Sequence, residues 1–231
     1  MINAAIIRLT LYLQQQLNLS SDQILMQSKI FSWQLAWDYP AFRLKFVLGI
    51  ITMAVIIFFL PEFFLFIQAR PGVFVNDLLL EKLPAHDVST YIFLILYPIG
   101  GFFIWRIIRN TSMCIIAIWG YSFLCLIRMM TILLIPLEPP AGLVHLTDPF
   151  LIYFYGAQEI TKDLFFSGHT ATIILIGLCL ENKWEKRIVF AAAAVLAVLL
   201  LIQHVHYTAD IVAAPVFSYF FWYVGKTISK I

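Results

Sequence analysis

Charged residues are scarce in this sequence: only 12% of its 231 residues are Asp, Glu, Lys or Arg, whereas 62% are hydrophobic. About a quarter of a typical soluble domain is charged, and those residues cover its water-facing surface. With so little charge, most of this chain cannot face water, and the composition excludes a soluble globular domain. The formal net charge is only +2 and no dense basic block is present, so we expect no nucleic-acid partner.

Cysteine and N-terminal targeting features are also sparse. Cys114, Cys125 and Cys179 lie inside apolar runs without metal-ligand spacing, so we interpret them as small hydrophobes in helix packing. A signal peptide is not expected, because Arg8 and the Gln14–Gln16 run interrupt the first apolar stretch. Residues 1–42 are less apolar than the rest and predict a cytoplasmic or interfacial amphipathic segment.

Long apolar runs fill the remainder, residues 43–231. About 20 apolar residues cross a bilayer as a helix. Six stretches fit this pattern: Phe46–Phe66, Tyr91–Trp105 with its flanks, Met113–Pro136, Gly168 to just before Glu181, Ile188–His204 and Ile211–Val224. Pro61-Glu62 is expected to interrupt the first, and the fourth is short, so its polar start must lie inside the membrane. The sequence therefore predicts an all-α integral membrane protein with six transmembrane helices.

Basic residues are distributed unevenly between the connections, and Lys and Arg favour the cytoplasmic side. They gather before the first stretch, between the second and third, between the fourth and fifth, and after the sixth: Arg8, Lys29, Arg43, Lys45; Arg106, Arg109; Lys183, Lys186, Arg187; Lys226, Lys230. The alternate connections hold more acidic residues. Both termini are therefore predicted to be cytoplasmic, and the start of the fourth helix and the junction of the fifth and sixth to be non-cytoplasmic.

Ionisable residues gather at these two non-cytoplasmic positions, where burial in lipid is costly without a function. His206 and Asp210 are four residues apart, which predicts one helical face, with the carboxylate orienting the imidazole. The free ring nitrogen of His206 could then attack phosphorus, while His169 donates or accepts a proton.

Three further residues suit a phosphate group. Ser167 and Gly168 precede the fourth helix, where Ser167 predicts an N-cap, Gly168 allows close approach of a ligand, and the helix N-terminus favours an anion. Arg128, near the outer end of the third helix, could bind a phosphodiester through two N–H groups.

Other interpretations of these residues are open. The His206–Asp210 pair and Ser167-Gly168-His169 could be local hydrogen bonds and caps, and Arg128 could pair with Asp210 or Glu138. Metal ligation by the histidines and Asp210 is disfavoured, because His204 and His206 point different ways on a helix. We therefore predict no metal and no other cofactor. A proton-relay transporter is a further alternative from a different functional class.

The motif Asp163-x3-Ser167-Gly168-His169-Thr170, followed by His206-Tyr207-Thr208-x-Asp210, resembles the paired C-terminal motifs of sphingomyelin synthases. That family is similar to the wider type 2 phosphatidic acid phosphatase-related superfamily. The segment from Arg128 to Pro140 resembles the region before those motifs.

The resemblance implies His206 as nucleophile, Asp210 as its orienting partner and His169 as general acid and base, with Asp163 and Tyr207 as accessory residues. It also implies a phosphohistidine intermediate, phospholipid and lipid-alcohol substrates such as ceramide, and a site on the non-cytoplasmic face of a bacterial inner membrane or a Golgi or plasma membrane. Leu200-Leu201 stands where lipid phosphatases carry a Ser-Arg pair, which favours transfer over hydrolysis. Hydrolysis by the same residues is the alternative activity.

Overall fold

The computed structural model describes residues 33–146 and 160–230. Most of the predicted N-terminal segment of residues 1–42 lies outside these ranges. Within them the regular elements are helices, and the one extended pairing is an isolated bridge between Val73 and Leu137. The prediction of a helical architecture is confirmed for this part of the chain.

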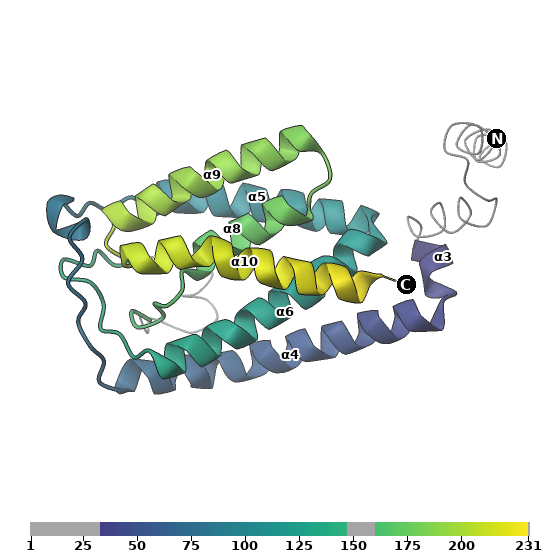
Figure 1. Cartoon of the computed structure of the whole chain (residues 1–231), viewed down its shortest axis with the longest axis horizontal. Helices are drawn as coiled ribbons and strands as arrows, with labels where there is room; N and C mark the ends of the chain where they lie inside the picture. Colours follow the sequence, from purple (N-terminus) through teal and green to yellow (C-terminus); the bar gives the residue numbers. More distant parts are fainter. Residues whose placement is uncertain (1–32, 147–159, 231) are drawn as a thin grey trace.

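The helices follow the order of the predicted spans (Figure 1). They are α3 (Trp33–Trp37), α4 (Pro40–Ala69), the 3₁₀ helix η1 (Leu80–Lys82), α5 (Ser89–Arg109), α6 (Thr111–Leu134), α8 (Gly168–Cys179), α9 (Lys183–Ile202) and α10 (Thr208–Ser229).

Four of these helices, α4, α5, α6 and α10, are long and apolar enough to cross a membrane. The fourth predicted span, α8, has only 12 residues. The fifth, α9, has 20 residues but opens with a charged turn that contains Lys183 and Glu185. The helices fit a multi-pass membrane protein, while the number of six spans stays a prediction.

Proline does not interrupt the first span as expected. The 30 residues of α4 continue through Pro61, and α5 and α10 likewise contain Pro98 and Pro215. Proline removes one backbone donor, but a membrane helix can tolerate this loss where the freed backbone groups find other partners. The predicted break at Pro61-Glu62 was therefore wrong for the backbone.

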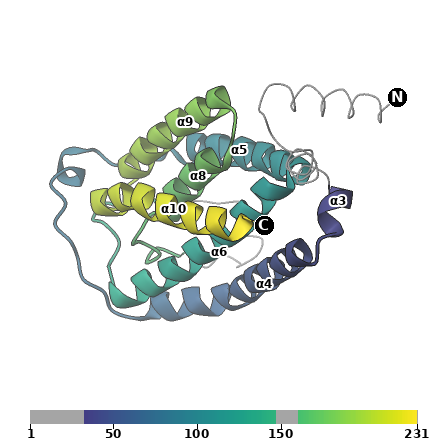
Figure 2. The same cartoon turned by 45° about the vertical axis from the view of Figure 1, so that its right-hand side comes forward.

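The helices form one bundle in which α6 and α10 pack closely. Glycine allows this approach: a Cβ at Gly225 would lie 2.6 Å from the Ile116 carbonyl oxygen, and one at Gly120 would lie 3.3 Å from the Phe221 carbonyl oxygen. Buried side chains of α8, such as Ala171 and Leu175, pack beside this pair. Figure 2 shows α8 enclosed between α5, α9, α10 and α6. The short helix is thus an interior element.

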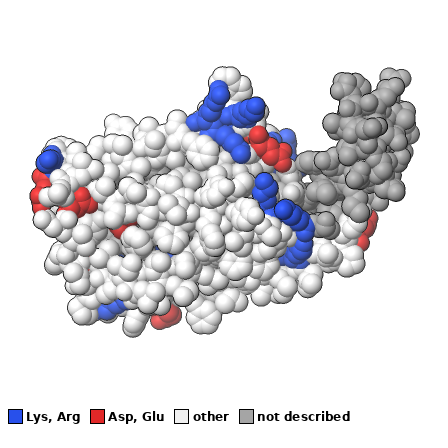
Figure 3. All heavy atoms as spheres, in the orientation of Figure 1, with Lys and Arg blue, Asp and Glu red and all other residues white. Residues whose placement is uncertain are grey.

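The ends of the helices alternate along the bundle. The C-terminal ends of α4, α6 and α9 lie at the same end as the N-terminal ends of α5, α8 and α10 (Figure 1). On the face in Figure 3, Lys and Arg gather toward the opposite end, and the middle carries few charged side chains. This arrangement brings the two His-containing segments, at the starts of α8 and α10, to one end of the molecule.

Candidate active site

His206 and Asp210 meet at the start of α10, though not on one helical face. The helix begins at Thr208, so His206 lies in the turn before it. The His206 Nδ1 atom lies 3.4 Å from Asp210 Oδ2, and the two side chains are only 2% and 0% exposed. The predicted pairing is present, but the turn between α9 and α10 creates it. The four-residue spacing predicted the correct contact, but the helix that it assumed does not extend back to His206.

The backbone around Asp210 fixes its carboxylate. The Tyr207 N–H donates to Asp210 Oδ2 at 3.0 Å, which caps α10. The Ser167 N–H donates to the Asp210 carbonyl oxygen at 3.1 Å and so connects the start of α8 to α10. Asp210 therefore faces His206 from a position that two chain segments determine.

His169 lies in the first turn of α8 and faces His206. The centroids of the two imidazole rings are 6.4 Å apart, with their planes at 63°. The predicted N-cap is present: Ser167 Oγ accepts from the Thr170 N–H at 3.4 Å, a distance at the upper limit for such a bond. Two histidines from helix starts distant in the sequence thus share one site, and His206 is the more buried.

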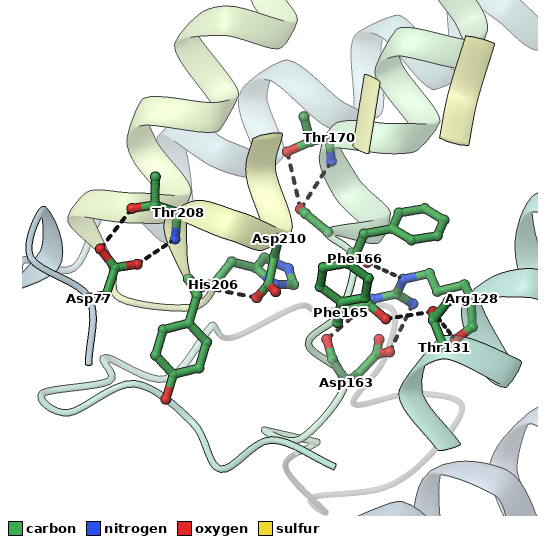
Figure 4. Close-up of polar contacts among 12 residues, drawn as sticks. Asp77, Arg128, Thr131, Asp163, Phe165, Phe166, Thr170, His206, Thr208 and Asp210 are labelled. Carbon is green, nitrogen blue, oxygen red and sulfur yellow. Dashed lines mark hydrogen bonds and ion pairs between the residues drawn. The ribbon is translucent and has the colours of Figure 1, made fainter. Parts of the chain in front are cut away.

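Arg128 of α6 lies against the segment that precedes α8 (Figure 4). Its Nη1 atom is 2.9 Å from Asp163 Oδ1, its Nε donates to the Phe166 carbonyl oxygen at 2.7 Å, and its Nη2 donates to the Asp163 carbonyl oxygen at 3.2 Å. Thr131, one turn further along α6, donates to the Phe165 carbonyl oxygen at 2.9 Å. The ionic partner of Arg128 is therefore Asp163, and neither of the partners considered from sequence, Asp210 and Glu138.

Gly168 provides the space that Arg128 occupies. A Cβ at this position would lie 2.7 Å from the guanidinium carbon of Arg128. The sequence suggested that this glycine admits a ligand to the backbone, and the structure places a protein cation there. The guanidinium is held beside the N-terminus of α8, and its role in binding phosphate stays a prediction.

Connections from outside the two motifs also contact the site. The Tyr207 hydroxyl donates to the Glu138 carbonyl oxygen at 2.9 Å, and Glu138 in turn pairs with Lys162 at 2.8 Å. The Asp77 carboxylate accepts from the N–H and the hydroxyl of Thr208 (Figure 4). Sequence reasoning missed Asp77 as a site neighbour, because no local pattern relates the connection after α4 to the start of α10.

The pKa of Asp77 lies below its ordinary value. Burial of the carboxyl group acts to raise this pKa, but the hydrogen bonds from Thr208, Leu80 and Leu79 together outweigh that effect. Hydrogen bonds to a carboxylate favour its charged form. Asp77 is therefore a carboxylate at neutral pH, placed at the N-terminus of α10, where a negative charge is favourable.

His204 does not face the two site histidines. Its Nδ1 and Nε2 atoms lie 2.8 Å from the Ala141 carbonyl oxygen and 3.0 Å from the Leu83 carbonyl oxygen. Both ring nitrogens thus contact the backbone of two connections, which leaves neither open to a metal. In residues 33–146 and 160–230, no group of three or more His, Cys, Asp or Glu side chains is placed to hold a metal ion.

The C-terminal part of the chain matches a known family. Residues 162–227 match the family model described as PAP2 superfamily C-terminal. The match includes both site histidines and Asp210, and it supports a relationship to the wider PAP2-related superfamily and to its lipid-phosphate chemistry of the phosphatase or phosphotransferase type. No curated protein and no solved structure matches the chain.

Proposed function

We propose that this protein is a membrane phosphotransferase that moves a phosphoryl headgroup from a phospholipid to a lipid alcohol such as ceramide. The proposal depends chiefly on one observation: His169 and His206 face each other across 6.4 Å between ring centroids, with Asp210 beside Nδ1 of His206. A phosphoryl group and its bridging oxygen can fill such a space.

In the first step, Nε2 of His206 attacks phosphorus. Because Nδ1 faces Asp210, Nε2 is the nitrogen that is free to react. The new N–P bond forms as the bond from phosphorus to the diacylglycerol oxygen breaks, and His169 gives its proton to the departing oxygen. The products are diacylglycerol and a phosphohistidine that still carries the headgroup, with Asp210 stabilising the positive charge on the ring.

In the second step, neutral His169 takes the hydroxyl proton of the acceptor lipid. The acceptor oxygen attacks phosphorus, the N–P bond breaks, and the headgroup leaves on the acceptor. His206 and His169 return to their starting states, so the two steps balance without a cofactor. Both lipids can reach the site sideways from the membrane.

Hydrolysis is the second candidate, with water in place of the lipid alcohol. The family match accommodates both outcomes. Transfer is favoured because Leu200 and Leu201, where lipid phosphatases carry a Ser-Arg pair, are buried apolar residues of α9 and supply no second cation. A proton-relay transporter is less well supported, because Arg128 and the helix start at Ser167-Gly168 favour phosphate chemistry over proton transfer alone.

The decisive experiment uses purified protein in detergent with a phospholipid labelled in its headgroup, with and without ceramide. We expect the label to move to ceramide, and diacylglycerol to form in equal amount. Release of a water-soluble headgroup phosphate at the same rate in both reactions would indicate a hydrolase instead. Absence of both products across phospholipid classes would contradict an enzymatic role. We also expect turnover to persist in EDTA, since the proposed steps use only side chains.

A further inference from the structure

The connection between α4 and α5 contacts the turn that carries His206. Asp77 Oδ2 accepts from the Thr208 N–H at 2.6 Å, and Asp77 Oδ1 accepts from the Thr208 hydroxyl at 2.9 Å. Two residues earlier, the Val75 N–H donates to the Tyr207 hydroxyl at 3.3 Å. Residues 75–77 thus hold the two residues that directly follow His206, at a separation of about 130 residues in the chain.

Asp77 is itself held in place. Its Oδ1 atom also accepts from the N–H groups of Leu79, the N-cap of the 3₁₀ helix η1, and of Leu80, its first residue. One carboxylate therefore caps η1 and α10 together. Figure 4 shows Asp77 and Thr208 on one side of the His206–Asp210 pair and Arg128 with Asp163 on the other.

The turn needs such support because His206 lies between α9 and α10, outside both helices. It precedes the first residue of α10, so its position depends on how residues 207 and 208 enter the helix. Asp210 fixes residue 207 from within α10 through the Tyr207 N–H. Thr208 is held by Asp77, which lies in another part of the chain. Displacement of a reacting group by about 1 Å can slow a reaction about 100-fold.

We infer that Asp77 is a positioning residue for His206. It orients the imidazole by capping α10 through Thr208. The inference rests on the proposed function, since it concerns the phosphorus-attacking imidazole. Asp77 touches no reacting atom. It sets the direction from which Nε2 of His206 approaches phosphorus, and it should therefore affect the rate of the chemical step more than substrate binding.

A matched control lies in the same connection. Asp87 Oδ1 accepts from the N–H and the hydroxyl of Ser89 at 3.0 and 2.8 Å, which is the same pair of donor types at the start of α5. Its loss removes a local cap, formed with the residue two positions on, from a helix that does not follow His206. Asp77→Ala and Asp87→Ala thus compare the loss of a helix cap at the proposed site with the loss of a helix cap elsewhere.

The experiment measures kcat and KM for headgroup transfer in the wild type, Asp77→Ala, Asp77→Asn, Thr208→Val, Asp87→Ala and His206→Ala, with thermal unfolding of each in detergent. We expect Asp77→Ala to lower kcat on the order of 10- to 100-fold with KM changed less than about 2-fold. Asp77→Asn keeps one acceptor oxygen for the Thr208 N–H but turns its NH2 group toward the N–H groups of Leu79 and Leu80, so it should lower kcat by less than Asp77→Ala and still leave it below the wild type. Asp87→Ala should lower the unfolding temperature by no more than Asp77→Ala does and leave kcat unchanged.

The outcomes separate the inference from the proposed function. Equal kcat in Asp77→Ala and Asp87→Ala, in an active enzyme that His206→Ala inactivates, would overturn the inference alone. A wild type without transfer or hydrolysis, or a fully active His206→Ala variant, would overturn the proposed function and the inference with it. If Asp77→Ala does not fold, Asp77→Asn and Thr208→Val carry the test: a lower kcat at unchanged KM supports the inference, and wild-type kcat in both overturns it.

Discussion

The two histidines of the site have different surroundings, and this difference assigns their proposed roles. His206 is 2% exposed and lies beside the buried Asp210 carboxylate, whereas His169, in the first turn of α8, is only partly buried. A buried imidazole with a fixed carboxylate partner has a defined tautomer and direction, which suits a nucleophile. A more open imidazole can exchange protons with two successive substrates, which suits an acid and base.

Replacement of either histidine should therefore abolish turnover while the protein stays folded. We expect no measurable transfer by His206→Ala or His169→Ala, and a loss on the order of 10⁴-fold for Asp210→Asn if the carboxylate acts like the orienting Asp of a hydrolase triad. The measurement is headgroup transfer per folded enzyme, with folding checked by thermal unfolding and gel filtration.

The control for this series is His86→Ala. His86 is exposed in the connection before α5, so we expect its variant to keep wild-type turnover. His204 would be a poor control. Its ring contacts the backbone of two connections that approach the site. Near-normal turnover by either site variant would contradict the roles assigned to the two imidazoles.

At the scale of the elements, the backbone before the short helix α8 needs hydrogen-bond partners, and α6 supplies them. Its 12 residues span about 18 Å, less than the roughly 30 Å of a bilayer core. Irregular backbone at membrane depth needs hydrogen-bond partners from the protein. Arg128 and Thr131 of α6 supply them to the carbonyl oxygens of residues 163, 165 and 166. One face of α6 thus holds the segment that leads to His169.

Gly168→Ala should disturb this arrangement. The new methyl group would lie 2.7 Å from the Arg128 guanidinium carbon, so the guanidinium must move away from the start of α8. We expect a loss of about 1–3 kcal/mol in the free energy of unfolding, as for other overpacked sites, together with reduced turnover. The measurements are denaturant or thermal unfolding and headgroup transfer.

Gly100→Ala is the matched control, because no atom lies within 4 Å of a Cβ at that position in α5. Alanine is the better helix former, so this variant should be as stable as the wild type or slightly more stable. If Gly168→Ala were as stable and as active as Gly100→Ala, the close approach of Arg128 to Gly168 would matter for neither stability nor activity.

Across the whole molecule, the alternating helix ends and the charge distribution both bear on which side of the membrane the candidate site faces. The starts of α8 and α10 share one end of the bundle (Figure 1), and the connection between α8 and α9 brings Lys183 to the other end. Lys and Arg favour the cytoplasmic side. The candidate site is therefore predicted to face away from the cytoplasm.

Cysteine labelling can test this orientation in a variant without the three native cysteines. Glu81→Cys lies in the connection between α4 and α5, and Lys183→Cys lies at the start of α9; both positions are exposed. In intact cells, a membrane-impermeant thiol reagent should label the cysteine at position 81 and leave the one at position 183 unlabelled until the membrane is permeabilised. The reverse pattern would place the site on the cytoplasmic side.

The sequence by itself determined the class of the protein and predicted the members of its candidate site. Composition and apolar run length depend only on which residues are present, and they predicted a helical membrane protein. The four-residue spacing related His206 to Asp210, and the resemblance of the two short motifs to those of a known family added His169. Ser167 was likewise predicted as an N-cap from its place before an apolar run.

Only the tertiary structure decided what surrounds these residues. The pairing of Arg128 with Asp163, the contact of Gly168 with the guanidinium and the cap of Asp77 on Thr208 each join segments far apart in the chain. No local period relates such partners, because helix packing and the course of the connections set their distance. Even the His206–Asp210 contact, correctly expected from spacing, lies in a turn that residues 75 and 77 contact from another part of the chain.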